Sequence, residues 1–239
     1  MTTSDQMRRI ALAFARASTR PRDRLCAACV EVLEVSGAGI TVMAGEQAGP
    51  LCVSNERMRL LEDLQFTTGE GPCRDAFTTR LPVLASQLDI EASGRWPAFV
   101  DLAVTSGIGS VFAFPMSSMG ATVGVLTLYQ DVAGALTTNQ HDDSMAVADV
   151  LSETVLSLQD LAPDGTLAPG LDDAVAYRAQ IHQASGMVSV QLRVSTREAL
   201  ARIRAYAFAH GRPVDRVAAD IVDRRLRLDD DRTRPDEGG

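Results

Sequence analysis

The last quarter of the chain, residues 171–228, constrains the fold most, because its apolar residues recur at the three- and four-residue steps of short amphipathic helices. This segment carries 10 arginines and 6 acidic residues, whereas residues 1–170 carry 11 arginines and 20 acidic residues. A basic helical module thus follows an acidic body. Such a charge distribution predicts that the basic module binds a polyanion, while residues 1–170 have a different role.

The length and composition indicate two domains without a membrane partner. A chain of 239 residues accommodates two domains of about 100–150 residues each, and 46% hydrophobic residues are enough to bury a core in both. No apolar run reaches the roughly 18–20 residues that a membrane span requires. The N-terminal segment MTTSDQMRRIALAFARAS is typical of an amphipathic helix rather than a cleavable signal, so cytoplasmic localisation is the default expectation.

Residues 8–160 alternate between helical and strand-like periodicity. The order predicted along the chain is helix, two strands, helix, strand, helix, two strands, helix. The strand-like runs are 39–43, 50–54, 81–86, 111–116 and 120–130. Thr137 is the predicted N-cap of a last helix that runs to about residue 160. This mixed order favours an α+β domain in which helices pack on an antiparallel sheet.

All four cysteines, Cys26, Cys29, Cys52 and Cys73, lie in this first domain and are expected to be free thiols in a reducing cytosol. Cys26 and Cys29 form a CxxC motif, but on a helix this spacing places two small apolar side chains on one face. A core role is therefore favoured over a redox or zinc role. A zinc site would need further ligands from Cys52, Cys73 or His141, and we expect no metal.

An ordered set of segments carries a resemblance in this domain: SNERMRLLEDLQFTTGEGPCRDAF, LPVLASQLD, RWPAF and VFAFPM with GVLTLY. Together they resemble a bacterial GAF domain over residues 8–160. The resemblance implies sensing of a small molecule or dimerisation, and it names no ligand or cofactor. The residues that would line a ligand pocket, or alternatively fill the core, are Phe66, Cys73, Trp96, Phe112 and Phe114.

The loop GEGPC at 69–73 has two interpretations. Cys73 could begin a helix whose positive dipole end lowers the thiol pKa and makes it a redox sensor. The favoured alternative is a turn made by the glycines and proline, with Cys73 as a small buried residue. Some GAF-fold proteins reduce free methionine sulfoxide with cysteines, which would require Cys52 and Cys73 as nucleophile and resolving thiol. No residue-level match supports that reaction.

Other catalytic classes find no support in the sequence. The histidines are His141, His182 and His210, and none stands in a HExxH motif. We therefore expect a protein that is not an enzyme.

Residues 161–170, LAPDGTLAPG, interrupt the helical pattern and are the predicted linker. In the first helix beyond it, about 172–192, an apolar stripe is interrupted by Gly186, where we expect close approach of another backbone. The second helix begins with a capping box from Ser195 to Glu198 and ends at Gly211. The third follows Pro213. Three helices of this size bury little surface, so contact with the first domain or a second subunit is expected.

This region resembles the ANTAR domain of bacterial transcription antitermination regulators. The resemblance is carried by RAQIHQASGM at 178–187, then Ser195, Glu198-Ala199, Arg204, Ala207, Val217-Ala218 and Ile221-Val222. It implies a homodimer that binds paired stem-loops in leader transcripts and so prevents a terminator from forming. The sequence departs from the family at two positions. Ser185 stands where lysine is common and Leu200 where phenylalanine is usual, which puts one phosphate contact in doubt.

Guanidinium groups bind phosphates and stack on unpaired bases, so the candidate RNA contacts are mostly arginines, with polar or stacking partners. They are Arg178, Gln183, Arg204, His210, Arg212 and Arg216. For each arginine alone, a solvated helix face or an ion pair to Glu198, Asp215 or Asp220 is an equal alternative. The hypothesis therefore depends on the arginines forming a common surface.

The acidic tail, 229–239, is expected to be disordered and to compete with RNA for that surface. Two further function classes stay open: a DNA-binding regulator built on a helix-turn-helix, and a sensor or scaffold without nucleic-acid binding.

Overall fold

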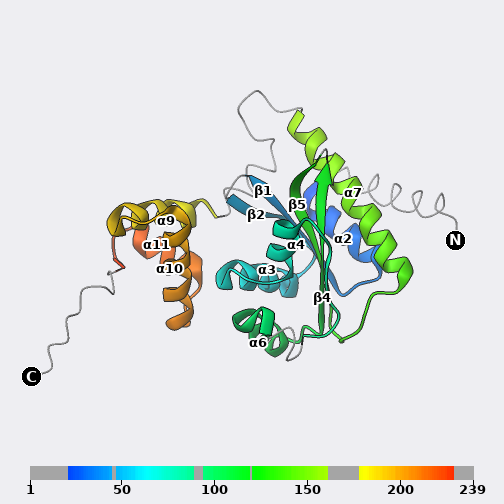
Figure 1. The fold of residues 1–239 in the computed structure, drawn as a ribbon, viewed down its shortest axis with the longest axis horizontal. Coiled ribbons are helices and arrows are strands. Elements are labelled where there is room, and N and C mark those ends of the chain that lie inside the picture. The colour runs from blue at the N-terminus through cyan, green and yellow to red at the C-terminus, as the bar shows by residue number, and fades with distance from the viewer. Residues whose placement is uncertain (1–20, 45–46, 89–93, 119, 161–177, 229–239) are drawn as a thin grey trace, which may run out of the picture. The chain divides into compact units, whose positions relative to one another are not determined.

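The computed structural model describes residues 21–44, 47–88, 94–118, 120–160 and 178–228 (Figure 1). The chain divides into two compact units, Met1–Tyr177 and Arg178–Gly239. The predicted linker at 161–170 and the acidic tail at 229–239 lie outside the described residues. The predicted domain boundaries therefore stay predictions.

The first unit is built on an antiparallel sheet with the strand order β2-β1-β5-β4-β3 (Figure 1). Its strands are β1 (Gly37–Ala44), β2 (Gln47–Val53), β3 (Val83–Ala85), β4 (Ser110–Ser118) and β5 (Ala121–Gln130). Each neighbouring pair is antiparallel. The predicted α+β class with an antiparallel sheet is confirmed.

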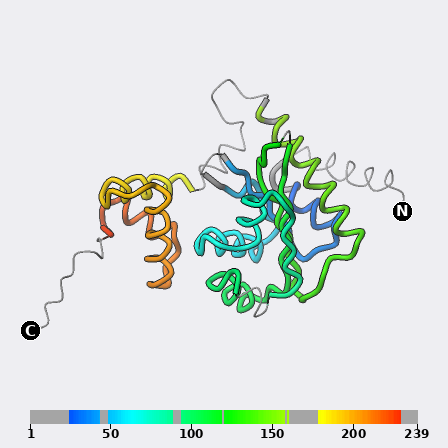
Figure 2. The backbone as a smooth tube through the Cα atoms, in the orientation of Figure 1, coloured from blue at the N-terminus to red at the C-terminus, as the bar shows by residue number. Residues whose placement is uncertain are grey.

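Helices cover both faces of the sheet, so each face has its own core. Helices α2 (Pro21–Leu33) and α7 (Thr138–Asp160) pack on one face, and α3 (Glu56–Thr68), α4 (Pro72–Thr79) and α6 (Pro97–Thr105) pack on the other (Figure 2). Thr137 caps α7 as predicted, since its hydroxyl accepts a hydrogen bond from the backbone amide of Gln140. Helix α4 is an element that the predicted order lacked.

Successive side chains of each strand point to opposite faces of the sheet. Phe112 and Phe114 point from β4 into the core beneath α2 and α7, whereas Val111 and Ala113 point into the core beneath α3, α4 and α6. Phe112 and Phe114 are both at most 1% exposed. The sheet therefore separates residues that are only one position apart in the sequence.

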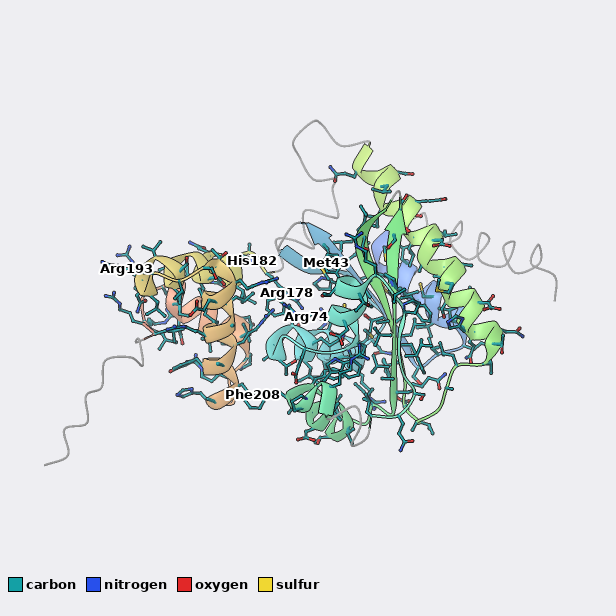
Figure 3. The ribbon with its side chains drawn as sticks, viewed as in Figure 1. Met43, Arg74, Arg178, His182, Arg193 and Phe208 are labelled. Carbon is teal, nitrogen blue, oxygen red and sulfur yellow. A yellow bond between two sulfur atoms is a disulfide. The ribbon has the colours of Figure 1, made fainter. Side chains whose placement is uncertain are left out.

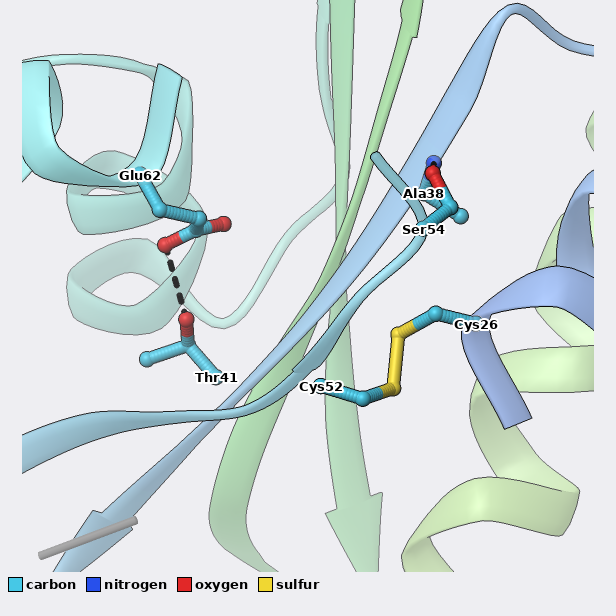
Figure 4. Close-up of a disulfide and its surroundings, with 6 residues drawn as sticks. All are labelled: Cys26, Ala38, Thr41, Cys52, Ser54 and Glu62. Atoms are coloured by element: carbon cyan, nitrogen blue, oxygen red, sulfur yellow. Dashed lines mark hydrogen bonds between the residues drawn. A yellow bond between two sulfur atoms is a disulfide. The ribbon is translucent and has the colours of Figure 1, made fainter. Parts of the chain in front are cut away.

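A disulfide joins Cys26 on α2 to Cys52 on β2 (Figure 4). The expectation of four free thiols is wrong for these two, because packing of α2 against the hairpin brings their Cα atoms to 6.0 Å, within the range that a disulfide spans. The pairing also excludes Cys52 as a nucleophile in the reductase alternative. Cys29 is fully buried, and burial raises the pKa of its thiol to about 12, so it stays protonated.

On the opposite face of the hairpin, the Thr41 hydroxyl donates to a Glu62 carboxylate oxygen at 2.8 Å (Figure 4). Both side chains are at most 4% exposed. This hydrogen bond gives the buried carboxylate a polar partner and fastens α3 to β1.

The second unit is a three-helix bundle, as predicted. It consists of α9 (Ala179–Leu192), α10 (Thr196–Ala209) and α11 (Val214–Val222). The apolar stripes converge on a core whose fully buried members include Ala184, Val188, Ile203 and Val217. Small residues at the contacts let three short helices pack closely.

The helix ends of this bundle follow the sequence signals closely. The Ser195 hydroxyl accepts from the Glu198 amide at 3.1 Å, and Gly211 has a φ of 58° just beyond α10. The Glu198 carboxylate accepts from Arg202 one turn later. The expected close approach at Gly186 is wrong for this chain's own described residues, because a Cβ built there would meet nothing within 4 Å.

Candidate functional site

The five predicted ligand-sensing residues do not form one pocket in the first unit. Phe112 and Phe114 belong to the core on the α2 and α7 face, and Cys73 and Trp96 belong to the core on the other face. Phe66 is buried on α3. A surface depression of about 430 Å³ includes only Phe112 among them; its lining is Leu84, Ser86, Phe112, Ala135, Leu136, Thr138 and His141. Four of these side chains thus belong to the two cores, Phe66 is buried on α3, and Phe112 also lines the depression.

The GEGPC loop is shaped by hydrogen bonds that end one helix and begin two others. Gly69 ends α3 with a φ of 73°, and Gly71 precedes α4 with a φ of 129°, which favours glycine at both positions. The Cys73 amide donates to Gln65 Oε1 at 2.8 Å. Cys73 stands at the start of helix α4, as one of the two interpretations expected, and with 5% exposure it is also the small buried residue of the other.

Glu70 has a role that sequence reasoning missed. Its Oε1 accepts from the amides of Ala98 and Phe99 at 2.6 and 3.0 Å, so it caps the start of α6 from 28 positions away. A carboxylate at a helix N-terminus satisfies unpaired amides and interacts favourably with the helix dipole. Because the cap comes from another part of the chain, no local spacing could have revealed it.

In the second unit, two of the candidate arginines, Arg178 and Arg204, lie close enough to His182 for their charges to affect its pKa. Arg178 stands at the N-cap of α9 and is only 3% exposed (Figure 3). Burial lowers the pKa of His182, and the positive charges of Arg178 and Arg204 lower it further. Arg178 and Arg204 thus share one environment, of which the Arg178 side chain is almost wholly buried.

Four other residues meet at the turn between α10 and α11, which we call the α10 corner: Tyr206, His210, Arg212 and Asp220. The rings of Tyr206 and His210 stack with centroids 3.9 Å apart and planes 19° apart. Asp220 accepts from Arg212 and, at 2.9 Å, from Arg225. Hydrogen bonds from Arg212 and then Arg225 lower the pKa of the Asp220 carboxyl, and the same carboxylate raises the pKa of both guanidiniums.

The remaining candidates are exposed. Gln183 on α9 and Arg216 on α11 are exposed, as is Arg193, which follows α9 (Figure 3). Further exposed arginines are Arg197, Arg224, Arg225 and Arg227. The structure thus places His210 and Arg212 at the α10 corner. Arg178 and Arg204 both act on His182. Gln183 and Arg216 are separate surface residues. For Arg212, the alternative of an ion pair with Asp220 is what the structure shows.

Tyr206 is a member of the α10 corner that was not among the candidate RNA contacts. It is partly exposed at the end of α10, four positions before His210. Side chains four apart on a helix are neighbours, so this spacing was the available signal for the ring pair.

The two departures from the ANTAR pattern differ in their surroundings. Ser185 is 3% exposed, and its hydroxyl donates to the Ile181 carbonyl at 2.8 Å. Leu200 is partly buried on α10. The serine side chain is thus satisfied within α9 and lies away from the solvent.

Comparison with known proteins assigns both units. Residues 170–222 match the family model of the ANTAR domain. In structure, the chain is similar to the GAF domain of an Acinetobacter phosphoenolpyruvate-protein phosphotransferase, with a TM-score of 0.52, 11% identity, and coverage of 69% of this chain and 99% of that one. The corresponding domain from Coxiella burnetii gives a TM-score of 0.50 at 10% identity, over 67% and 98% of the two chains.

A free methionine-R-sulfoxide reductase from Thermoplasma acidophilum is also similar, with a TM-score of 0.41 and 16% identity over 55% of this chain and 89% of that one. A likeness this distant says nothing about chemistry. A search of curated protein sequences found no match. No helix among the described residues is long and apolar enough to cross a membrane.

The first unit therefore has the GAF fold, and a small helical module follows it. That module is an ANTAR domain, and the architecture is GAF followed by ANTAR.

Proposed function

We propose that this protein is an RNA-binding transcription antitermination regulator whose second unit binds stem-loops in nascent leader transcripts. The observation that carries the proposal is the ANTAR match over 170–222, which coincides with the basic three-helix bundle. Exposed arginines on this bundle, among them Arg193, Arg197 and Arg216, supply the phosphate contacts. Gln183 adds a polar group on the exposed side of α9.

The first unit supplies the input in this proposal. GAF-fold domains bind small molecules or dimerise, and both roles would act through α7, the last described element before the second unit. The predicted pocket residues are core residues here, so a small ligand would enter elsewhere or the unit would set a homodimer. No ligand or cofactor is proposed for it.

Filter binding across a salt series tests the proposal with the full chain, a hairpin RNA and a duplex DNA of matched length. Tighter binding of the hairpin, with affinity that falls steeply as salt rises, is expected because phosphate contacts release counterions. Equal or tighter binding of duplex DNA would favour the DNA-regulator alternative. If the protein binds neither polymer, the alternative that remains is a sensor or scaffold without nucleic-acid binding.

Arg216→Ala is a sharp companion variant. Its side chain is exposed, and its backbone amide donates to Asp215 Oδ1 at 2.8 Å. Loss of one phosphate contact should reduce the salt slope by about 0.7–1. Arg212→Ala, whose guanidinium is already held by Asp220, should change the slope less.

A further inference from the structure

The α10 corner offers an aromatic face that has no stacking partner among the described residues. One face of the His210 ring lies on Tyr206, with a separation of 3.9 Å between centroids and near-parallel planes. His210 is nonetheless an exposed residue. A ring has two faces, and in the described part of the chain Tyr206 is the ring that stacks on His210, so the second face is available to a ligand.

The His210 ring is also held in place before any ligand arrives. Its backbone amide donates to the Tyr206 carbonyl at 3.1 Å, and Nδ1 lies 2.8 Å from the same oxygen. Since a carbonyl oxygen only accepts, Nδ1 carries a proton and donates it. Nε2 is then the nitrogen that points away from the helix, and the ring loses little conformational freedom on binding.

The charges around this ring are largely balanced. Arg212 pairs with Asp220, and Arg225 pairs with both Asp220 and Asp223. Two guanidiniums therefore face two carboxylates. A phosphate would have to displace these carboxylates, whereas an uncharged ring would not.

Apolar surface lies at the same end of α10. Phe208, two positions before His210, is 55% exposed (Figure 3). Exposed aromatic residues on a nucleic-acid-binding module are typical stacking platforms, because every base has a π face and RNA recognition favours unpaired bases. The corner itself combines a fixed aromatic face with compensated charge, and Phe208 projects from another side of α10, because residues two apart on a helix do not face each other.

We propose that the second face of the His210 ring is a stacking site for an unpaired RNA base. The second unit then recognises the loop of a hairpin at the α10 corner and the phosphates of its stem with exposed arginines elsewhere. This inference rests on the proposed function and deepens it, because it assigns a base-binding site in addition to phosphate binding.

The test compares two probes: a hairpin with an adenosine-rich loop, and the same stem closed by an ethylene-glycol linker. His210→Ala in the full chain should weaken binding of the looped hairpin by about 5- to 100-fold, as expected for loss of one base–aromatic stack. Its salt slope should stay that of the unchanged protein, because stacking releases no counterions. Binding of the linker-closed stem should not change.

His210→Phe is the matched control, because it keeps the ring and removes the nitrogens. It should retain at least half of the affinity for the looped hairpin, and its circular dichroism spectrum should match that of His210→Ala. A 2-aminopurine placed in the loop should lose fluorescence on binding the unchanged protein and His210→Phe, but not on binding His210→Ala.

Two results would overturn the stacking site while leaving the proposed function intact: unchanged loop affinity in His210→Ala, or an equal loss for both probes. Failure of the unchanged protein to bind either probe would instead overturn the proposed function, and the stacking site with it.

Discussion

Cys26 and Cys52 form a disulfide that fastens helix α2 to β2, the edge strand of the sheet. Edge strands have hydrogen-bond partners on one side only. The disulfide therefore adds a covalent link to a strand that has a single neighbouring strand in the sheet. Both α2 and the first strands of the sheet contribute to the core that contains Cys29 and Leu33. The bond therefore stabilises the part of the first unit that begins the described chain.

Reduction of this disulfide should destabilise the first unit. The cross-linked residues are 26 positions apart, and the chain-entropy relation gives about 3.5 kcal/mol for a loop of that size. Urea unfolding of the full chain should show a lower midpoint in the presence of a dithiol reductant. The double variant Cys26→Ala with Cys52→Ala should not respond to the reductant. Titration of unfolded, unreduced protein should find two reactive thiols; four would contradict the bond.

The stability of the second unit should fall as the pH is lowered through about 6.5. Burial and the charges of Arg178 and Arg204 hold the pKa of His182 below its ordinary value of 6.5, so the unfolded chain takes up this proton before the folded chain does. Below the pKa that His182 has in the folded protein, this loss of stability is complete. Thermal unfolding from pH 8 to pH 5 measures it, and His182→Gln should flatten this part of the profile. Parallel profiles for both proteins would refute the assignment.

Asp220→Asn should strengthen binding of hairpin RNA. Asp220 holds both Arg212 and Arg225, and loss of its charge releases Arg212 for phosphate, whereas Arg225 keeps its ion pair with Asp223. Asp223→Asn is the control, because it removes the same charge but contacts Arg225 alone. A several-fold gain for Asp220→Asn and a smaller one for Asp223→Asn are expected at low salt. Equal gains would mean that net charge, not the release of Arg212, is responsible.

Deletion of residues 229–239 should also raise RNA affinity. This segment contains five acidic residues and two arginines, and it begins directly after Leu228, whose carbonyl accepts from Gln191 at the end of α9. Its acidic residues can compete with phosphate for the exposed arginines of the second unit. The gain should shrink as salt rises. A full-length variant with amides in place of the five carboxylates should behave like the deletion, and unchanged affinity in both would end the competition idea.

Gly186→Ala should stabilise the isolated protein. The position lies within α9 with no atom of the described chain near a built Cβ, and alanine is favoured over glycine in a helix by about 1 kcal/mol. Chemical unfolding measures this gain, with Gly211→Ala as a contrast that should destabilise because of its φ of 58°. Should Gly186→Ala lower stability in a concentration-dependent manner, the glycine would lie at an interface between copies.

Local sequence signals were sufficient for most elements. The period of apolar residues predicted the strands of the sheet and the three helices of the second unit, because side-chain alternation and helical repeat are properties of a few consecutive residues. Ser195, Thr137 and Gly211 were identified as helix ends for the same reason. Helix α4 was missed because it has only eight residues and begins inside a glycine-rich turn.

The candidate sites were harder to predict, since they depend on which faces meet. The sequence left open whether Phe112, Phe114, Cys73 and Trp96 line a pocket or fill the core, and strand alternation together with the helices above each face divides them between two cores. Likewise, the arginines looked like one surface, yet Arg178 is buried near His182 and Arg212 is held by Asp220. Spacing along a chain cannot tell a buried guanidinium from an exposed one.

The sequence alone determined the fold class, the basic character of the last helices and their resemblance to ANTAR domains, because these follow from composition and short-range periodicity. Only the tertiary structure decided that Cys26 pairs with Cys52, that Glu70 caps α6 from a distant loop, and that Asp220 on α11 holds Arg212. Those contacts join side chains whose separation is set by the packing of whole helices and strands, a distance that no local pattern encodes.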